Sequence, residues 1–281
     1  MDPTLTGPSP TFRIHEPTSG ETPVVVEVPH AGLDVTPPVL ANLIAPARSL
    51  AADADLYVDD LYTDAPQEGA TLLVSRVSRY VCDLNRAEGD VDPRAAAGVS
   101  PRSSTHGVVW VATTEGLPAL ARPLHAHELQ ARLDEVYRPY HRALRCLLDR
   151  KRERFGFVIL LCAHSMPSRN KGEGRGRHAR ADIVPGSRGR TTACAAVVDC
   201  PDVLAREFAW SVAHDDPYRG GFTTAHYGKP AGSTHAVQLE LSRSLYMDER
   251  TFDKLPGKFG RVRDYCRTLV ARLGKIVPAS G

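Results

Sequence analysis

The sequence lacks the features that mark several large classes of protein. Its longest apolar run, Phe157 to Ala163, is far shorter than the roughly 20 residues of a membrane-spanning helix. Residues 1–23 contain neither the basic region nor the apolar region of a secretory signal. The net charge is only +2, which gives no general basic footprint for nucleic acid but leaves room for a local cationic pocket. We therefore expect a cytoplasmic protein that binds neither membranes nor nucleic acid and acts on a small molecule.

Two common zinc and redox motifs are also absent. The chain has no HExxH sequence and no CxxC pair, and its six cysteines are scattered. Without an export signal, these cysteines are expected to be reduced thiols, mostly buried. A composition of 42% hydrophobic and 24% charged residues is ordinary for a globular protein with a sizeable core.

The order of apolar runs predicts an open, mainly parallel α/β sheet. Residues 1–22, rich in Pro, Thr, Ser and Gly, are expected to be a flexible segment, followed by a single α/β domain over residues 23–281. Short β-branched or apolar runs predict strands, and apolar residues spaced three to four apart predict helices. The expected strands are 23–29, 70–75, 79–84, 157–163 and 236–241, and the expected helices are 55–65, 125–155, 201–214 and 251–273. Such alternation is typical of α/β proteins.

Polar side chains gather where these strands end. His30 follows the first strand, His164 follows the strand 157–163, and Glu240 lies near the end of the strand 236–241. Asn85-Arg86 closes the strand 79–84. Ligands of open α/β sheets bind outside the carboxyl ends of the strands, so this pattern predicts a polar active site built around a metal.

Each residue also has an ordinary structural interpretation. A histidine after a strand is more often a turn or capping residue, and Arg79 and Arg86 could be surface charges paired with Asp83 or Glu88. Glu240 is harder to explain in this way, because a carboxylate in a buried strand is costly unless it is paired or functional. Four aspartates could simply form the acidic start of a helix, where the helix dipole favours them: Asp53, Asp55, Asp59 and Asp60.

Taken in order, seven segments resemble the N-formylglutamate amidohydrolase (deformylase) family over roughly residues 23–249. They are Val28-Pro29-His30-Ala31-Gly32, residues 53–62 (DADLYVDDLY), residues 78–86 (SRYVCDLNR), residues 163–168 (AHSMPS), residues 181–186 (ADIVPG), residues 220–228 (GGFTTAHYG) and residues 238–242 (QLELS). The resemblance implies a zinc-carboxypeptidase-like, phosphorylase/hydrolase-like fold with three layers. In that fold a mainly parallel or mixed central sheet is flanked by helices.

The resemblance also implies one catalytic zinc per chain, with another divalent metal left open. His30 and His164 would be ligands, and a carboxylate from the Asp55/Asp59 segment would be the third. Asp59 is favoured and Asp55 is the alternative. The zinc carboxypeptidases place a Glu three residues after the first His, whereas Leu33 stands there in this chain.

The remaining site residues follow from the same resemblance. Glu240 would be the general base, and Arg79 would stabilise the developing oxyanion. Asn85-Arg86 would hold the α-carboxylate of the substrate, because Arg offers a planar, bidentate fork. Arg188 and His226 are assigned to substrate binding, with Arg188 as the second cation that a dicarboxylic substrate needs. The implied reaction is the hydrolysis of N-formyl-L-glutamate to formate and L-glutamate.

Three alternatives stay open. Family members usually carry Arg at the position of Ala225. Its absence from this chain would permit a different N-acyl amino acid or small amide as substrate. Cys162 or Cys82 could instead be a nucleophile, although both lie in apolar runs that favour inert thiols. The chain could also be an inactive relative that binds a metal or an anion. Whether it forms a homo-oligomer is not indicated by the sequence.

Overall fold

The computed structural model describes residues 9–96, 106–169 and 179–278. By their contacts the residues form two compact units. One consists of residues 1–14, 29–56 and 73–146, and the other of residues 15–28, 57–72 and 147–281. A six-stranded sheet has the order β1-β3-β2-β4-β6-β5. No helix in the described part of the chain is both long enough and apolar enough to cross a membrane.

The second unit contains the long strands of the sheet. β2 (Val24–Val28) pairs in parallel with β4 (Val158–Met166), and β4 pairs in parallel with β6 (Thr234–Ser242). β5 (Ile183–Gly186) pairs antiparallel with β6, so the sheet is mixed. Every residue of β2, β4, β5 and β6 is buried, as their nearly continuous apolar runs predict for strands covered on both faces.

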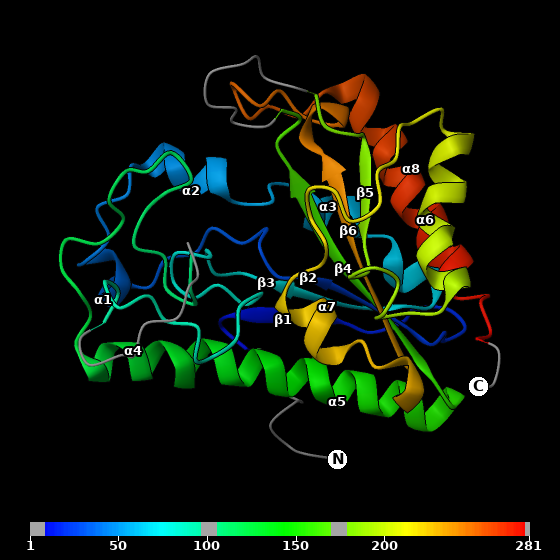
Figure 1. Cartoon of the computed structure of the whole chain (residues 1–281), viewed down its shortest axis with the longest axis horizontal. Helices are drawn as coiled ribbons and strands as arrows, with labels where there is room; N and C mark the ends of the chain where they lie inside the picture. The colour runs from blue at the N-terminus through cyan, green and yellow to red at the C-terminus, as the bar shows by residue number, and fades with distance from the viewer. Residues whose placement is uncertain (1–8, 97–105, 170–178, 279–281) are drawn as a thin grey trace. The chain divides into compact units, whose positions relative to one another are not determined.

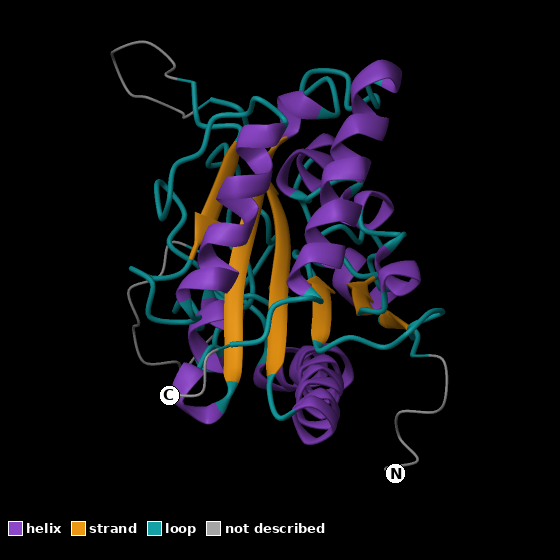
Figure 2. Cartoon of the chain, turned by 90° about the vertical axis from the view of Figure 1, so that its right-hand side faces the viewer, coloured by secondary structure: helices purple, strands orange, loops and turns teal. Residues whose placement is uncertain are grey.

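Helices cover both faces of these strands. α6 (Ala195–Glu207) and α8 (Pro256–Leu273) pack on each other, and α6 also contacts β5 and β6. α7 (Phe222–Tyr227) contacts β4 and β6 from the opposite side (Figure 1). In the view turned by 90°, helices lie in front of the sheet (Figure 2). The predicted layered α/β architecture is therefore confirmed.

The other elements are short, with one exception. The expected helix 125–155 is continuous: α4 (Ala126–Arg132) passes through the π-helical turn η3 (Leu133–Tyr137) into α5 (Arg138–Phe155). The short helices are α1 (Pro37–Leu40), α2 (Ala47–Asp53) and α3 (Val58–Leu61). The 3₁₀ turns are η2 (Ala65–Glu68), η4 (Pro230–Gly232) and η5 (Arg243–Leu245).

Two strands flank this core, and one of them lies where no regular structure is expected. β3 (Thr71–Ser75) was predicted. β1 (Phe12–His15) lies inside the segment 1–22. It is anchored because Phe12 is buried edge-on against Tyr140, with ring centroids 5.8 Å apart, and because the carbonyl of Thr11 accepts a hydrogen bond from Arg76 N. That residues 23–281 form one domain remains a prediction.

Several predicted boundaries are wrong, for identifiable reasons. Residues 79–84 form turns rather than a strand, because Val81 N bonds back to the carbonyl of Ser78 and Tyr80 N bonds to the Ser78 hydroxyl. β4 continues through His164 to Met166, so His164 lies within the strand. The helix expected over 201–214 occupies 195–207, since Pro201 is tolerated inside α6. The helix expected over 55–65 shrinks to α3 and η2, and α8 begins at Pro256.

Candidate active site

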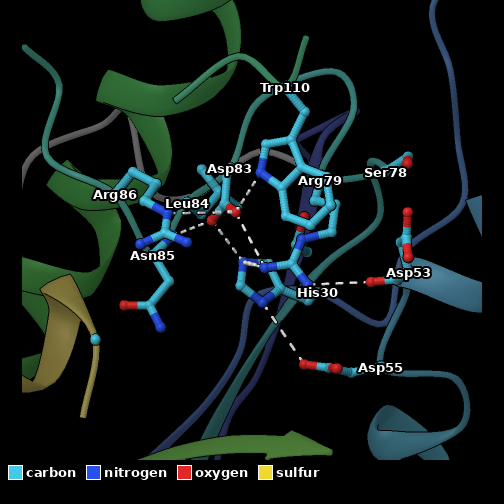
Figure 3. A network of polar contacts seen from close by, with 12 residues as sticks. His30, Asp53, Asp55, Ser78, Arg79, Asp83, Leu84, Asn85, Arg86 and Trp110 are labelled. Carbon is cyan, nitrogen blue, oxygen red and sulfur yellow. Dashed lines mark hydrogen bonds and ion pairs between the residues drawn. The ribbon is translucent and has the colours of Figure 1, made fainter. Parts of the chain in front are cut away.

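His30 stands at the end of β2 and is held by carboxylates on both sides of its ring. It is buried, with 2% of its surface exposed. Its Nε2 lies 2.8 Å from Asp83 Oδ1, and its Nδ1 lies 3.6 Å from Asp55 Oδ2 (Figure 3). The backbone N–H of Asp55 donates to the carbonyl of His30, at 2.9 Å. An imidazole pinned at Nε2 by a carboxylate presents its Nδ1 in a defined direction, as metal-binding histidines commonly do.

Asp83 is the centre of the polar network around His30. Its fully buried carboxylate accepts hydrogen bonds from Arg79 Nη2 at 3.0 Å, Trp110 Nε1 at 2.9 Å and the backbone N–H of Asn85 at 2.9 Å. Arg86 Nε lies 3.9 Å away. Burial would raise the pKa of Asp83, but the charges of Arg79 and His30 hold that pKa well below its usual range. Asp83 is therefore an ionised carboxylate inside the protein.

Arg79 is held by hydrogen bonds within the protein rather than pointing into solvent. Its guanidinium donates to Asp83 and to the carbonyl of Asp53, the latter at 3.0 Å, and lies 4.4 Å from the ring centroid of Trp110. Burial would lower the pKa of Arg79, but the charges of Asp83 and Asp55 raise it, so the group is charged. Its Nε is buried and has no hydrogen-bond partner among the described residues. Arg79 does pair with Asp83, yet it does so within a buried cluster.

The carboxylate of Asp53 connects Tyr80 and Thr114 within this cluster. It accepts hydrogen bonds from the hydroxyl groups of Tyr80 and Thr114 and from the backbone N–H of Thr114, at 3.1 Å for the last. Its contacts to the loop 110–114 explain why part of the acidic run is buried rather than lying on a solvated helix face. The interpretation as an exposed acidic helix start fails for Asp53 and Asp55, which are both 3% exposed.

One group of side chains in the described part of the chain has the make-up of a metal site. His30, Asp55 and His164 each offer one ligand atom, and these atoms all lie within 4.8 Å of one another. All three residues are buried. Asp55, the alternative carboxylate of the sequence analysis, belongs to this group and Asp59 does not. Asp59 is half-buried in α3, where burial and the neighbouring charge of Asp60 raise its pKa.

The charges of this region fit a divalent cation. Three buried carboxylates, from Asp53, Asp55 and Asp83, interact with the charge of Arg79, and Arg86 Nε lies 3.9 Å from Asp83. Excess negative charge inside a protein is costly unless it is paired or coordinates a metal. Two imidazoles and one carboxylate are also a ligand set typical of catalytic zinc, which uses three protein ligands and keeps one position open.

Glu240 lies beside His164 in the sheet. The two are paired in register on the parallel strands β6 and β4, and Glu240 is 5% exposed. Gln238 Nε2 donates to Glu240 Oε1 at 2.8 Å, and Gln238 Oε1 accepts from the backbone N–H of Gly221 at 2.8 Å. Glu240 is thus a buried carboxylate held by a neutral donor from its own strand.

The remaining predicted substrate residues lie in different surroundings. Asn85 is 9% exposed, and Arg86 is partly exposed. Arg188 is exposed and left-handed at φ 54°, and its guanidinium donates to the carbonyl of Gly220 at 3.0 Å. His226 is exposed on α7, with its ring stacked 4.9 Å from that of Phe222. Much of the basic segment 169–190 from which Arg188 was chosen, residues 170–178, lies outside the described residues.

Comparison with known proteins shows the family of this chain. The sequence model of the N-formylglutamate amidohydrolase family matches residues 22–247, which is most of the chain. The chain belongs to this family. It is 35% identical over 244 residues to the N-formylglutamate deformylase of Pseudomonas putida, covering 82% of this chain and 84% of the relative. It is also 35% identical, with the same coverage, to the N-formylglutamate deformylase of Pseudomonas aeruginosa.

Solved structures agree with this assignment. The crystal structure of N-formylglutamate amidohydrolase from Ralstonia eutropha JMP134 matches with a TM-score of 0.86 and 31% identity, covering 94% of this chain and 97% of that one. A gene product of Agrobacterium tumefaciens matches with a TM-score of 0.66 at 18% identity, covering 94% and 96% of the two chains, and shows the shared fold alone.

The two cysteines considered as nucleophiles do not have the properties of reactive thiols. Cys82 and Cys162 are both buried, and burial raises the pKa of each well above that of a free thiol. A thiol must ionise to act as a nucleophile, so these surroundings favour inert core cysteines.

Sequence reasoning missed three residues that contact the predicted site residues. Asp83 was considered only as a surface partner for arginine, and Trp110 and Gln238 were not considered as site residues. Asp83 and Gln238 share a usable signal, since each is a polar residue within an apolar run. Trp110 carries no such signal, because its approach to Asp83 depends on how a distant loop packs.

Proposed function

We propose that this protein hydrolyses N-formyl-L-glutamate to formate and L-glutamate, with one zinc ion per chain. The observation that carries the proposal is the buried His30, Asp55 and His164 group, in a chain that belongs to the N-formylglutamate amidohydrolase family. The relatives named as N-formylglutamate deformylases support the choice of substrate. We also propose that residues 23–281 act as one catalytic domain, since the family match is continuous over residues 22–247.

His30, Asp55 and His164 are the proposed metal ligands. A zinc ion held there would supply Lewis-acid chemistry, polarising the formyl carbonyl and activating water. Asp83 would fix the ring orientation and tautomer of His30 through its Nε2, leaving Nδ1 for the metal. This role explains why a carboxylate is kept ionised and buried at that position.

Glu240 is the proposed general base. Its carboxylate would take a proton from the attacking water as the water oxygen bonds to the formyl carbon. It would then deliver that proton to the glutamate nitrogen as the C–N bond breaks, so that an amine leaves rather than an amide anion. Its pairing with His164 on the adjacent strand supports the assignment, because a base must lie within hydrogen-bond reach of the water it deprotonates.

Arg79 and Arg86 are proposed to act on different parts of the substrate. Arg79 is a fixed, charged donor with a buried Nε, which supports a role at the developing oxyanion. Arg86 is partly exposed and next to Asn85, which supports capture of the α-carboxylate. Arg188 and His226, both exposed, remain the proposed contacts for the side-chain carboxylate.

The first test is a formate-release assay joined to metal analysis. We expect the purified protein to contain about one zinc per chain and to release formate from N-formyl-L-glutamate. Removal of the metal should abolish activity, and added zinc should restore it. A panel of N-formyl and N-acetyl amino acids tests the alternative substrate that Ala225 leaves open. Full activity in metal-free protein would contradict the zinc-dependent mechanism.

The second test separates the two arginines. Arg86→Ala should mainly raise KM, because it removes a contact present in both the ground state and the transition state. Arg79→Ala should mainly lower kcat, by about 10²–10³-fold, as expected when one oxyanion donor is lost. The α-amide of N-formylglutamate should be a poor substrate for the parent protein. Equal turnover of the acid and the amide would refute the assignment of Asn85 and Arg86.

A further inference from the structure

Gln238 lies in the middle of β6 and connects Glu240 to a loop outside the sheet. Its side chain is buried, with 3% of the residue exposed. Its Oε1 accepts a hydrogen bond from the backbone N–H of Gly221 at 2.8 Å. Its Nε2 donates to Glu240 Oε1 at 2.8 Å. One amide therefore links the loop residue and the carboxylate.

The chemistry of the two partners determines which way the amide faces. A backbone N–H can only donate, so the amide oxygen of Gln238 must face Gly221. The amide nitrogen must then face Glu240, and an N–H donor directed at a carboxylate makes a charge-assisted bond. The hydrogen bond to Gly221 thus fixes a donor on one oxygen of Glu240.

Two glycines allow the loop to come this close. Gly186 of β5 is the register partner of Gln238, and a Cβ there would lie 2.7 Å from Gly220 N and 2.8 Å from the carbonyl oxygen of Tyr218. The loop therefore packs directly against the β5 backbone, which a side chain at residue 186 would prevent. Gly220 adopts φ +98°, a conformation that L side chains rarely adopt. Packing of this loop against the β5 backbone therefore brings the Gly221 N–H within hydrogen-bond distance of Gln238.

We propose that Gln238 is a positioning residue for the hydrolysis, holding the carboxylate of Glu240 in the orientation in which it acts as a base. This inference rests on the proposed function of Glu240. A glutamate side chain has several rotatable bonds, and a displacement of about 1 Å at a reacting group can reduce the rate about 10²-fold. Gln238 restrains one carboxylate oxygen and leaves the chemistry to Glu240.

The test is a double-mutant cycle between Gln238→Met and Glu240→Gln. Methionine is similar in length but makes neither hydrogen bond. Gln238→Met should lower kcat for N-formyl-L-glutamate by about 10–100-fold, the usual effect of losing a supporting hydrogen bond, with KM and zinc content nearly unchanged. In the Glu240→Gln background the same change should have almost no further effect, because Gln238 acts only through Glu240.

Thr192→Val is the matched control. The Thr192 hydroxyl is buried and donates to the carbonyls of Ala236, at 2.8 Å, and Ser187, at 3.2 Å, so it also ties a loop to β6 but does not touch Glu240. This variant should show a similar fall in melting temperature with kcat preserved. If Gln238→Met does not fold, Gln238→Asn replaces it with the same expected loss, since its shorter amide cannot reach both partners.

The outcomes separate the two proposals. Parental kcat in folded Gln238→Met, or equal losses of kcat with and without Glu240, would overturn the positioning role alone. An inactive parent protein, or a fully active Glu240→Gln variant, would instead overturn the proposed function on which this inference rests.

Discussion

Replacing Glu240 by glutamine is expected to lower kcat by about 10²–10⁴-fold, the usual contribution of general acid–base catalysis. The amide matches the carboxylate in size but cannot accept the proton of the attacking water. The protein should still fold and keep its metal, because glutamine can still accept the hydrogen bond from Gln238 through its oxygen. Formate release, zinc content and melting temperature should be measured on one preparation.

A purely structural role for Glu240 predicts the opposite result, a lower melting temperature with kcat unchanged. Asp64→Asn is the control variant expected to give that result. Asp64 is a mostly buried carboxylate that accepts two hydrogen bonds from Arg263, each at 2.7 Å. Asp64→Asn should lower the melting temperature and leave kcat per folded molecule unchanged. If Glu240→Gln behaves in the same way, destabilised but fully active, Glu240 is not the base.

The second large effect is expected at Asp55. Asp55→Asn should release the metal and abolish activity, because Asp55 is the carboxylate grouped with His30 and His164. The loss of zinc affinity should exceed the roughly 10–100-fold that follows when only a supporting residue of a metal site is changed. Elemental analysis after dialysis gives a readout that does not depend on turnover.

Asp59→Asn is the control for this experiment. Asp59 lies four residues further along the chain and is half-buried. Burial raises its pKa. Removing its charge should leave zinc content and kcat close to those of the parent protein. Loss of metal from Asp59→Asn, with metal retained in Asp55→Asn, would restore the ligand that the sequence analysis favoured.

The features predictable from the sequence are those with a local physical cause. Buried strands need continuous apolar, β-branched runs, so the sequence alone locates β2, β3, β4 and β6. Strand ends collect functional side chains, which is why His30 and Glu240 were found as candidates. Seven sequence segments, taken in their order along the chain, also indicated its family, and the family match confirms this prediction.

Other features depend on partners far away in the chain. The run 79–84 has the composition of a strand, yet it forms turns that aim Asp83 at His30, which lies 53 residues earlier. β5 carries a proline and a glycine, and it is a strand because β6 offers an antiparallel edge. Neither outcome can be read from propensity, since tertiary contacts override it.

The sequence by itself determined the family, the apolar strands and the kinds of residue available for catalysis, because these depend on composition and order along the chain. Only the tertiary structure decided that Asp55 rather than Asp59 is grouped with the two histidines, that Asp83 contacts His30, and that Gln238 contacts Glu240. Aspartates four residues apart carry the same chemistry, and the backbone path alone brings one of them within a few ångströms of an imidazole.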